Sequence, residues 1–203
     1  MKQQFSLRTG LLWTAFALSL LFLPHFSPAL VGVAQTKPKS QISAGDRQAI
    51  TQFEERVKAY VKLRGKVKAK LPSLSKDSTP EQIETYRKTF EASLRAARGG
   101  ATRGAIFTPA AADYIRRTLK TEFKGKDRAE LREIVFEAET QGVPLRVNYP
   151  YPEAKELTEM PPTLLLELPQ LPKEVRYRFV GRNMLLVDRD NNLIIDYMVD
   201  ALP

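Results

Sequence analysis

The side chains of this sequence that could take part in chemistry are carboxylates, hydroxyls, lysines and arginines. Cysteine is absent, and histidine and tryptophan occur once each, as His25 and Trp13. Both lie in an N-terminal segment that we expect to be removed, so histidine or cysteine triads, zinc sites of the usual kind and histidine-ligated haem are excluded. The acidic neighbours Glu54 and Glu55 diverge on their predicted helix and would not face one substrate. We identify no catalytic residue and expect no cofactor.

The carboxylates of one segment begin like a calcium loop. Asp188, Asp190 and Asn192 match the first three ligand positions of such a loop. Leu193 stands where the loop needs glycine, and Val199 stands where it needs the bidentate glutamate. A polar hairpin turn explains the same residues through local hydrogen bonds, so we expect no metal site.

A row of lysines is the clearest charged feature of the helical half. Its members recur every four residues, which places them on one face of a helix, where like charges repel one another slightly. The row is either a solvated face that keeps the protein soluble or a binding face for anions. The row consists of Lys58, Lys62, Lys66 and Lys70.

Three arginines surround the glycines of the segment ARGGATRGAIF: Arg95, Arg98 and Arg103. A glycine-rich loop that leads into a helix can hold a phosphate group. The lysine and hydroxyl signature of a nucleotide-binding loop is missing, however, so nucleotide binding is unsupported. The segment is either a connector with exposed arginines or a second anion site.

The first 34 residues have the plan of a secretory signal peptide. Lys2 and Arg8 precede an apolar run from Gly10 to Leu23, and a stretch rich in proline and small residues ends at Ala34. The apolar run is too short to cross a membrane comfortably. We therefore expect export to the periplasm or secretion. The alternative is an uncleaved membrane anchor.

Cleavage near Ala34, with Ala29 as the alternative site, would leave a polar tether at 35–42 and a single domain at 43–203. The whole chain has a formal net charge of +9, and removal of Lys2 and Arg8 leaves +7. A basic exported protein meets anionic envelope polymers, lipid head groups or acidic proteins more readily than nucleic acid, which we do not expect as a partner.

Apolar residues at helical spacing predict four helices in the first part of this domain. A serine or threonine at the N-cap opens the first three, and proline follows it in the second and third. The predicted helices run from about residue 44 to between Gly65 and Lys70, from Pro80 to Gly99, from Pro109 to Gly125, and from Asp127 to Gly142.

A proline-rich connector follows at 143–172. We expect Leu145–Val147 to form a short edge strand, and 162–168 to form a short helix or a strand. Three antiparallel strands then follow, at 175–180, 183–188 and 193–199, because Gly181-Arg182 and Asp190-Asn191 are turn sequences.

The hairpin turns predict which residues lie opposite one another in the sheet. Tyr177 would face Leu186, and Leu186 would face Ile195. Arg178 and Asp196 would flank Leu185 in one cross-strand row on the outer face, either as an ion pair or as a functional pair. The core face would carry Val175, Tyr177, Phe179, Met184, Leu186, Leu193, Ile195, Tyr197 and Val199.

The C-terminal quarter of the chain carries the patterns YRFVGR from Tyr177, LVD from Leu186, NLIID from Asn192 and ALP at the end. In these patterns it resembles small exported bacterial proteins of a family whose members are described as hypothetical. The resemblance implies export and a shared fold, and it implies no activity.

These observations predict an α+β fold, with about four N-terminal helices packed on a C-terminal three- to four-stranded antiparallel β-meander. The function that we expect is that of a non-catalytic accessory or binding protein of the bacterial envelope with a basic surface. One alternative is a carboxylate-based hydrolase of the envelope. Another is a membrane-surface protein held by an uncleaved N-terminal anchor.

Overall fold

The helical half begins at a capped serine. A computed structural model of the chain describes residues 42–124, 144–152, 158–160 and 162–202. Helix α1 (Ala44–Lys68) starts after Ser43, whose Oγ accepts a hydrogen bond of 3.0 Å from the backbone nitrogen of Asp46. The predicted start is thus confirmed. The helix ends at Lys68, so Lys70 lies just beyond it.

The two threonine–proline starts are also confirmed. Helix α2 (Pro80–Ala97) follows Thr79, which forms a reciprocal capping box with Gln82. Helix α3 (Pro109–Glu122) follows the N-cap Thr108. The fourth predicted helix, from Asp127 to Gly142, lies outside the described residues. Within the proline-rich connector, the segment 162–168 that was expected to form a short helix or a strand forms the helix α5 (Pro162–Glu167).

The C-terminal strands form an antiparallel meander, and the fold class is α+β as predicted. The strands are β1 (Thr158–Glu159), β2 (Val175–Val180), β3 (Asn183–Asp188) and β4 (Ile194–Met198), and they lie in the sheet in this order. The sequence placed three of these strands, β2 to β4. The additional strand is β1, which pairs with Arg178 and Phe179 of β2.

The expected edge strand at Leu145–Val147 is wrong, because these residues form no strand. The next residues of the connector instead run beside the start of β4. The backbone nitrogen of Asn148 donates to the carbonyl of Ile194 at 2.9 Å, and Pro150 forms an isolated bridge with Leu193.

The predicted pairing is correct between β2 and β3 and wrong between β3 and β4. Tyr177 pairs with Leu186 as expected. A bulge between Leu186 and Val187 then shifts β4 by one residue, so that Leu186 pairs with Asp196. Because side chains alternate between the faces of a sheet, this shift moves Asp196 to the core face, and the row that was to join it to Arg178 does not form.

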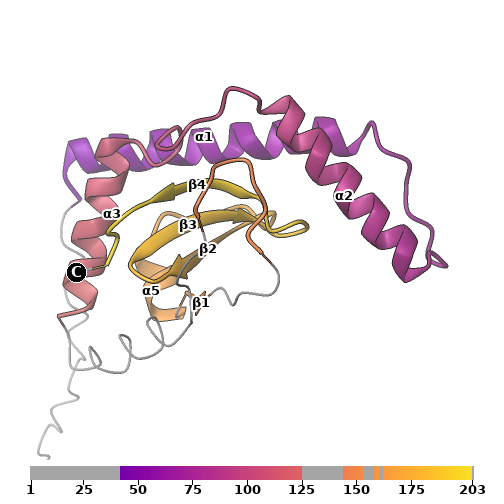
Figure 1. Ribbon diagram of the computed structural model, residues 1–203. Helices are drawn as coiled ribbons and strands as arrows, with labels where there is room; N and C mark the ends of the chain where they lie inside the picture. The colour runs from indigo at the N-terminus through magenta and orange to yellow at the C-terminus, as the bar shows by residue number, and fades with distance from the viewer. Residues whose placement is uncertain (1–41, 125–143, 153–157, 161, 203) are drawn as a thin grey trace, which may run out of the picture. The chain divides into compact units, whose positions relative to one another are not determined.

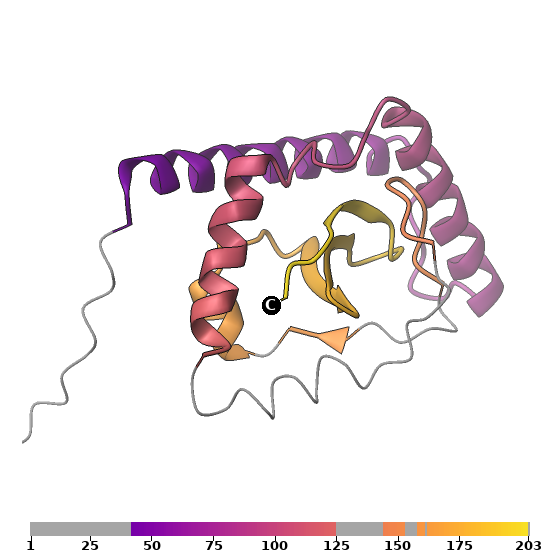
Figure 2. The same cartoon turned by 60° about the vertical axis from the view of Figure 1, so that its left-hand side comes forward.

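Three helices, α1, α3 and α5, pack on one face of the sheet. α1 runs along this face, and α2 and α3 lie at opposite ends of α1 (Figures 1 and 2). Side chains of α1, α3 and α5 share one buried cluster with the inward residues of the strands. Within this cluster the rings of Phe53 and Tyr177 stack at 6.4 Å between centroids. The cover that a sheet with an apolar face requires is thus supplied mainly by the preceding helices, as predicted.

The other face of the sheet has a smaller core of its own. Leu185, Val187 and Ile194 form a buried cluster there with Tyr151 of the connector. The half-buried Tyr197 packs against this cluster, whereas the sequence placed it on the helix-covered face. The one-residue shift of β4 accounts for this difference, as it does for Asp196.

Candidate anion-binding surface

A buried ion pair fixes α1 to the turn between β3 and β4. Oδ2 of Asp188 accepts hydrogen bonds from the hydroxyl of Tyr60 and from Nε of Arg64, both at 2.7 Å. The Arg64 guanidinium also contacts the carboxylate of Asp190 and lies over the ring of Phe90, with Cζ 5.1 Å from the ring centroid. The acidic turn that resembled a calcium loop is therefore neutralised by arginine.

The pKa values of these groups follow from burial and from charge. Burial works against the charged form of Arg64, but the hydrogen bonds and charges of Asp188 and Asp190 outweigh it and raise the pKa of Arg64. For Asp190 the same arginine outweighs burial and lowers the pKa. Burial, and then the charge of Asp188, raise the pKa of the Tyr60 hydroxyl. These shifts keep Arg64 charged, Asp190 ionised and the Tyr60 hydroxyl neutral at neutral pH.

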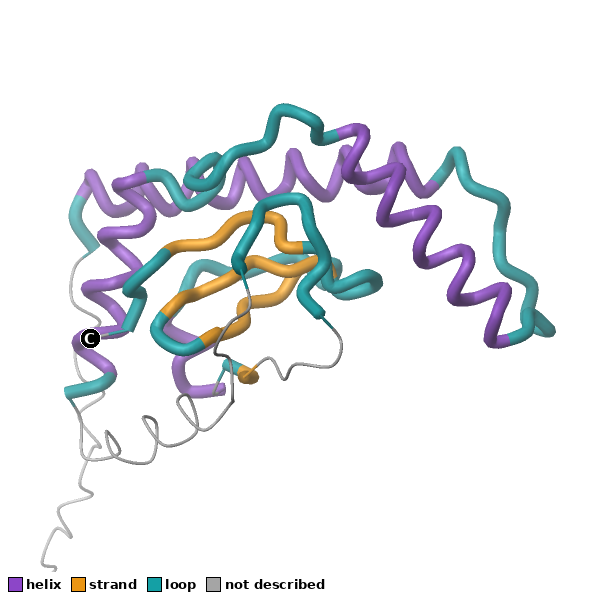
Figure 3. The backbone as a smooth tube through the Cα atoms, viewed as in Figure 1, coloured by secondary structure: helices purple, strands orange, loops and turns teal. Residues whose placement is uncertain are grey.

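The backbone of the glycine- and arginine-rich loop between α2 and α3 holds a carboxylate of the protein itself, that of Asp196. Figure 3 shows this loop running back along α1. The carboxylate of Asp196 is fully buried and accepts hydrogen bonds from the backbone nitrogens of Gly104, Ile106 and Phe107 at 2.9, 2.7 and 2.8 Å. The loop therefore has the anion-holding geometry considered from the sequence, with an internal ligand.

Arg98 joins the same part of the core and is not a surface cation. Its guanidinium donates to Oδ1 of Asn148 at 2.6 Å and to the carbonyl of Ile195 at 2.8 Å, and it lies over the ring of Tyr60. Burial lowers the pKa of Arg98. Its role is thus to join the loop after α2 to the connector and to β4.

Arg95, in the last turn of α2, and Arg103, in the loop, lie over separate aromatic rings. Arg95 forms an ion pair with Glu91 at 3.4 Å and lies over Tyr149, with Cζ 4.2 Å from the ring centroid. Arg103 is exposed and lies 5.6 Å from the ring centroid of Tyr197. Because each arginine has a different partner, the three do not form one anion site.

The lysine row is the part of the predicted basic surface that stays free. Lys58, Lys62, Lys66 and Lys70 are all exposed. The first three lie on the side of α1 away from its buried residues, and Lys70 lies two residues beyond the end of the helix. None of the four has an ion pair or a side-chain hydrogen bond within the described residues. Lys68, which is not part of the row, contacts Asp190 at 3.4 Å. At about 1.5 Å per residue, the row extends for about 18 Å. We call these four residues the lysine row.

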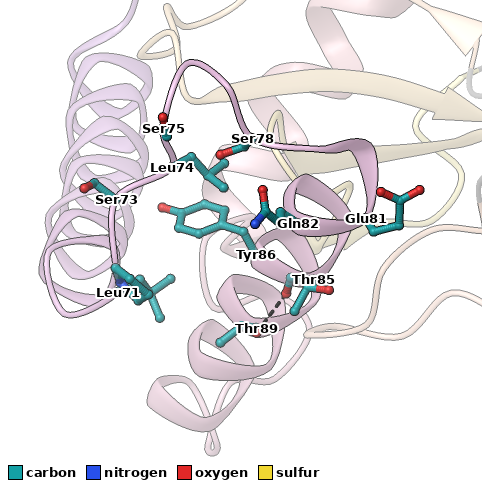
Figure 4. A pocket seen from close by; sticks show the side chains of 11 residues that line it. Leu71, Ser73, Leu74, Ser75, Ser78, Glu81, Gln82, Thr85, Tyr86 and Thr89 are labelled. Carbon is teal, nitrogen blue, oxygen red and sulfur yellow. Dashed lines mark hydrogen bonds between the residues drawn. The ribbon is translucent and has the colours of Figure 1, made fainter.

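A cavity of about 480 Å³ opens between the α1–α2 connection and α2. Figure 4 shows Tyr86 extending from α2 toward Leu74 of the connection. Several of its polar side chains are already used: Ser75 accepts from the nitrogen of Asp77, and Thr89 donates to the carbonyl of Thr85. The cavity offers an aromatic wall and hydroxyl groups, and among its lining residues Glu81 is the one carboxylate.

The buried carboxylates are not arranged as a catalytic pair. Asp188 and Asp196 are both fully buried, and each accepts several hydrogen bonds from the protein. Neither lines the cavity at Tyr86. Among the residues that the structure describes, no three histidine, cysteine or acidic side chains come together as a metal site would require. None of the described helices has the length and apolar character needed to cross a membrane.

The fold and this surface define an α+β protein that presents an exposed row of lysines beside a buried network in which Arg64 is paired with Asp188 and Asp190. No family model, curated protein or solved structure matches the chain in our comparisons. Sequence reasoning found the lysine row, because helical spacing determines which face is exposed. It did not find the partners of Asp188 and Asp196. Two features of the sequence could have indicated that these groups are paired inside the protein. Arg64 lies on the apolar face of its helix, and Asp196 lies within an apolar strand.

Proposed function

We propose that this protein is an exported, non-catalytic binding protein of the bacterial envelope, and that the lysine row is its contact with anionic partners. The observation that carries the proposal is that four exposed lysines, three on α1 and Lys70 just beyond its end, have no ion pair or side-chain hydrogen bond within the described residues. The neighbouring cations Arg64 and Lys68 are paired with acids. Unpaired charges held on a rigid helix remain available to an external anion.

Envelope polymers and lipid head groups would offer these lysines the same chemistry, which is a series of closely spaced negative charges. Each lysine near an anionic surface contributes about 1 kcal/mol, so four acting together give substantial binding that salt would weaken. The signal-like segment 1–34 supports a location where such anions occur. The tether 35–42 would leave the lysine row accessible after cleavage.

The experiment that tests this role is co-sedimentation of the purified protein with vesicles. Vesicles that contain phosphatidylglycerol should bind the protein at low ionic strength, and vesicles of phosphatidylcholine alone should not. A parallel binding measurement with a soluble polyanion identifies which source of negative charge is preferred. Replacement of all four lysines of the row by glutamine should abolish most of the binding, because glutamine keeps the helix propensity and removes the charge.

A control variant with the same net charge makes the result specific. Four exposed lysines outside the row supply this control: Lys76, Lys88, Lys120 and Lys124. Lys88 forms an exposed ion pair with Glu84. Replacement of all four by glutamine should leave binding largely intact. If both quadruple variants lose binding equally, net charge rather than the row is responsible and the proposed role of the row is wrong.

Export is tested separately by the N-terminus and intact mass of the native protein from fractionated cells. A chain that begins near Gln35 in the soluble envelope fraction is the expected result. A chain that retains Met1 in the membrane fraction would show instead that residues 1–34 serve as an anchor.

A further inference from the structure

A second cavity, of about 300 Å³, lies along the edge of β2. Among the described residues, β1 pairs only with Phe179 and Arg178, and no described strand pairs with the first half of β2 on that side. Pro162, which begins α5, carries no backbone N–H group and cannot extend the ladder. The lining residues belong to α5, to the segment between α5 and β2, and to β2 itself. Met160 and Arg189, which follow β1 and β3, complete the lining.

The lining of this cavity includes several cations. Lys173, Arg176 and Arg189 line it, and no acidic residue is found among its described lining residues. Lys173 and Arg189 are exposed, and their side chains have no ion pair or hydrogen bond within the described residues. Arg178 also lines the cavity, but it donates to the carbonyl of Tyr177 and has further interactions, so the inference rests on the other three cations.

Arg176 has unused hydrogen-bonding capacity. Its Nη2 atom donates to Oδ1 of Asn192 at 2.6 Å, which fixes the position of the guanidinium. Its Nε atom is buried and has no hydrogen-bond partner. Because Nε is not accessible from outside, Arg176 contributes its positive charge to the cavity lining, and no hydrogen bond from Nε to a ligand is assumed.

The lining also includes apolar residues. Met160 and Val175 are buried, whereas Leu165 is 44% exposed and Leu171 is partly buried. A volume of about 300 Å³ is at the lower end of the range for small-molecule sites, so the cavity suits a short aliphatic or aromatic group rather than a complete lipid. A lining that combines cations with apolar side chains is complementary to an anion that carries such a group.

We propose that this cavity is a binding site for a small amphiphilic anion. The carboxylate or phosphate ester group would contact Arg189 and Lys173, with the charge of Arg176 nearby. The short apolar group would lie against Leu165, Leu171 and Met160. This site is separate from the lysine row and does not depend on its role.

Calorimetric titration of the full-length protein tests the proposal. Octanoate and octyl phosphate serve as probes, and the comparison between them shows whether a carboxylate or a phosphate is preferred. Octanol lacks the charge and inorganic phosphate lacks the apolar group, so each should bind at least about tenfold more weakly than its amphiphilic counterpart. If neither amphiphile binds, or if inorganic phosphate binds as well as octyl phosphate, the proposal is wrong.

Variants locate the binding on the protein. Arg189→Gln removes an exposed guanidinium without a partner, so it should preserve the fold and weaken the better probe about tenfold. Leu165→Ala should weaken octyl phosphate and leave the weak binding of inorganic phosphate unchanged. Arg103→Gln makes the same charge change away from the cavity and should have no effect. The glutamine variant of the lysine row should also bind normally. If either of these last two variants weakens binding as much as Arg189→Gln does, the attraction is general and the cavity is not the site.

Discussion

The Oδ2 atom of Asp196 accepts a 2.7 Å hydrogen bond from the backbone nitrogen of Ile106, at a separation of 90 residues. Phe107 and Gly104 add further backbone donors to the same carboxylate. Gly104 has a φ of 82°, a conformation that glycine adopts without strain and that helps several N–H groups of the loop to converge. An anion-holding loop is thus used to attach the α2–α3 connection to the sheet.

Asp196→Asn should destabilise the protein. The amide has nearly the same shape, but it loses the charge and can direct its NH₂ group at backbone donors that need an acceptor. We expect a loss of about 2–3 kcal/mol in the free energy of unfolding, measured by urea denaturation. Asp113→Asn, at an exposed position on α3, should change stability by less than about 0.5 kcal/mol. Equal stability of the two variants would contradict the structural role of the Asp196 carboxylate.

Arg64→Met should be more damaging. Methionine can keep much of the packing against Phe90, but it leaves the carboxylate of Asp188 buried without its cation. Breaking a buried ion pair in this way costs about 3–5 kcal/mol, which urea denaturation would detect.

The double variant of Arg64→Met with Asp188→Asn provides the control for this interpretation. It should be less unstable than the sum of the two single variants, because the lone buried charge is gone. Additive losses would show that the two residues do not act as a pair. Lys62→Met, on the exposed side of the same helix, should have little effect on stability.

Tyr60 should make the stability fall at high pH. Its hydroxyl donates to Asp188 and its pKa is raised well above the ordinary 10.0. Above pH 10 the unfolded chain therefore releases a proton that the folded protein retains, and the free energy of unfolding decreases as the pH rises. Below that range the contribution of Tyr60 is fully present. Burial raises the pKa of Tyr177 in the same direction.

The ultraviolet absorbance of tyrosinate measures this effect. During an alkaline titration Tyr60 and Tyr177 should stay protonated until the protein unfolds, whereas in guanidinium chloride all the tyrosines should ionise near pH 10. Tyr60→Phe should make the loss of stability above pH 10 less steep. A Tyr60 that ionises in the folded protein near its ordinary pKa would overturn the assignment.

Signals contained within a few residues identified much of the fold from the sequence. The Thr79 and Thr108 caps precede prolines and determined where α2 and α3 begin, and a two-residue turn at Gly181-Arg182 gave the pairing of β2 with β3. The exposure of the lysine row followed from the apolar spacing of α1. In each case the residues that carry the signal are neighbours along the chain.

The pairing of β4 and the partners of the buried charges were decided only by the tertiary structure. A one-residue bulge reverses the faces of Asp196 and Tyr197, and no local pattern indicated where the extra residue would be placed. Arg98 looked like one of several loop arginines, yet contacts with Asn148 and Ile195 make it part of the core. The choice of partner for a buried charge depends on which groups the packed elements bring within hydrogen-bonding distance, and Arg64 and Asp188 are 124 residues apart. The sequence by itself therefore determined where the helices begin and that four lysines face outward, while the tertiary structure decided which charges are consumed inside the protein and which remain free to bind.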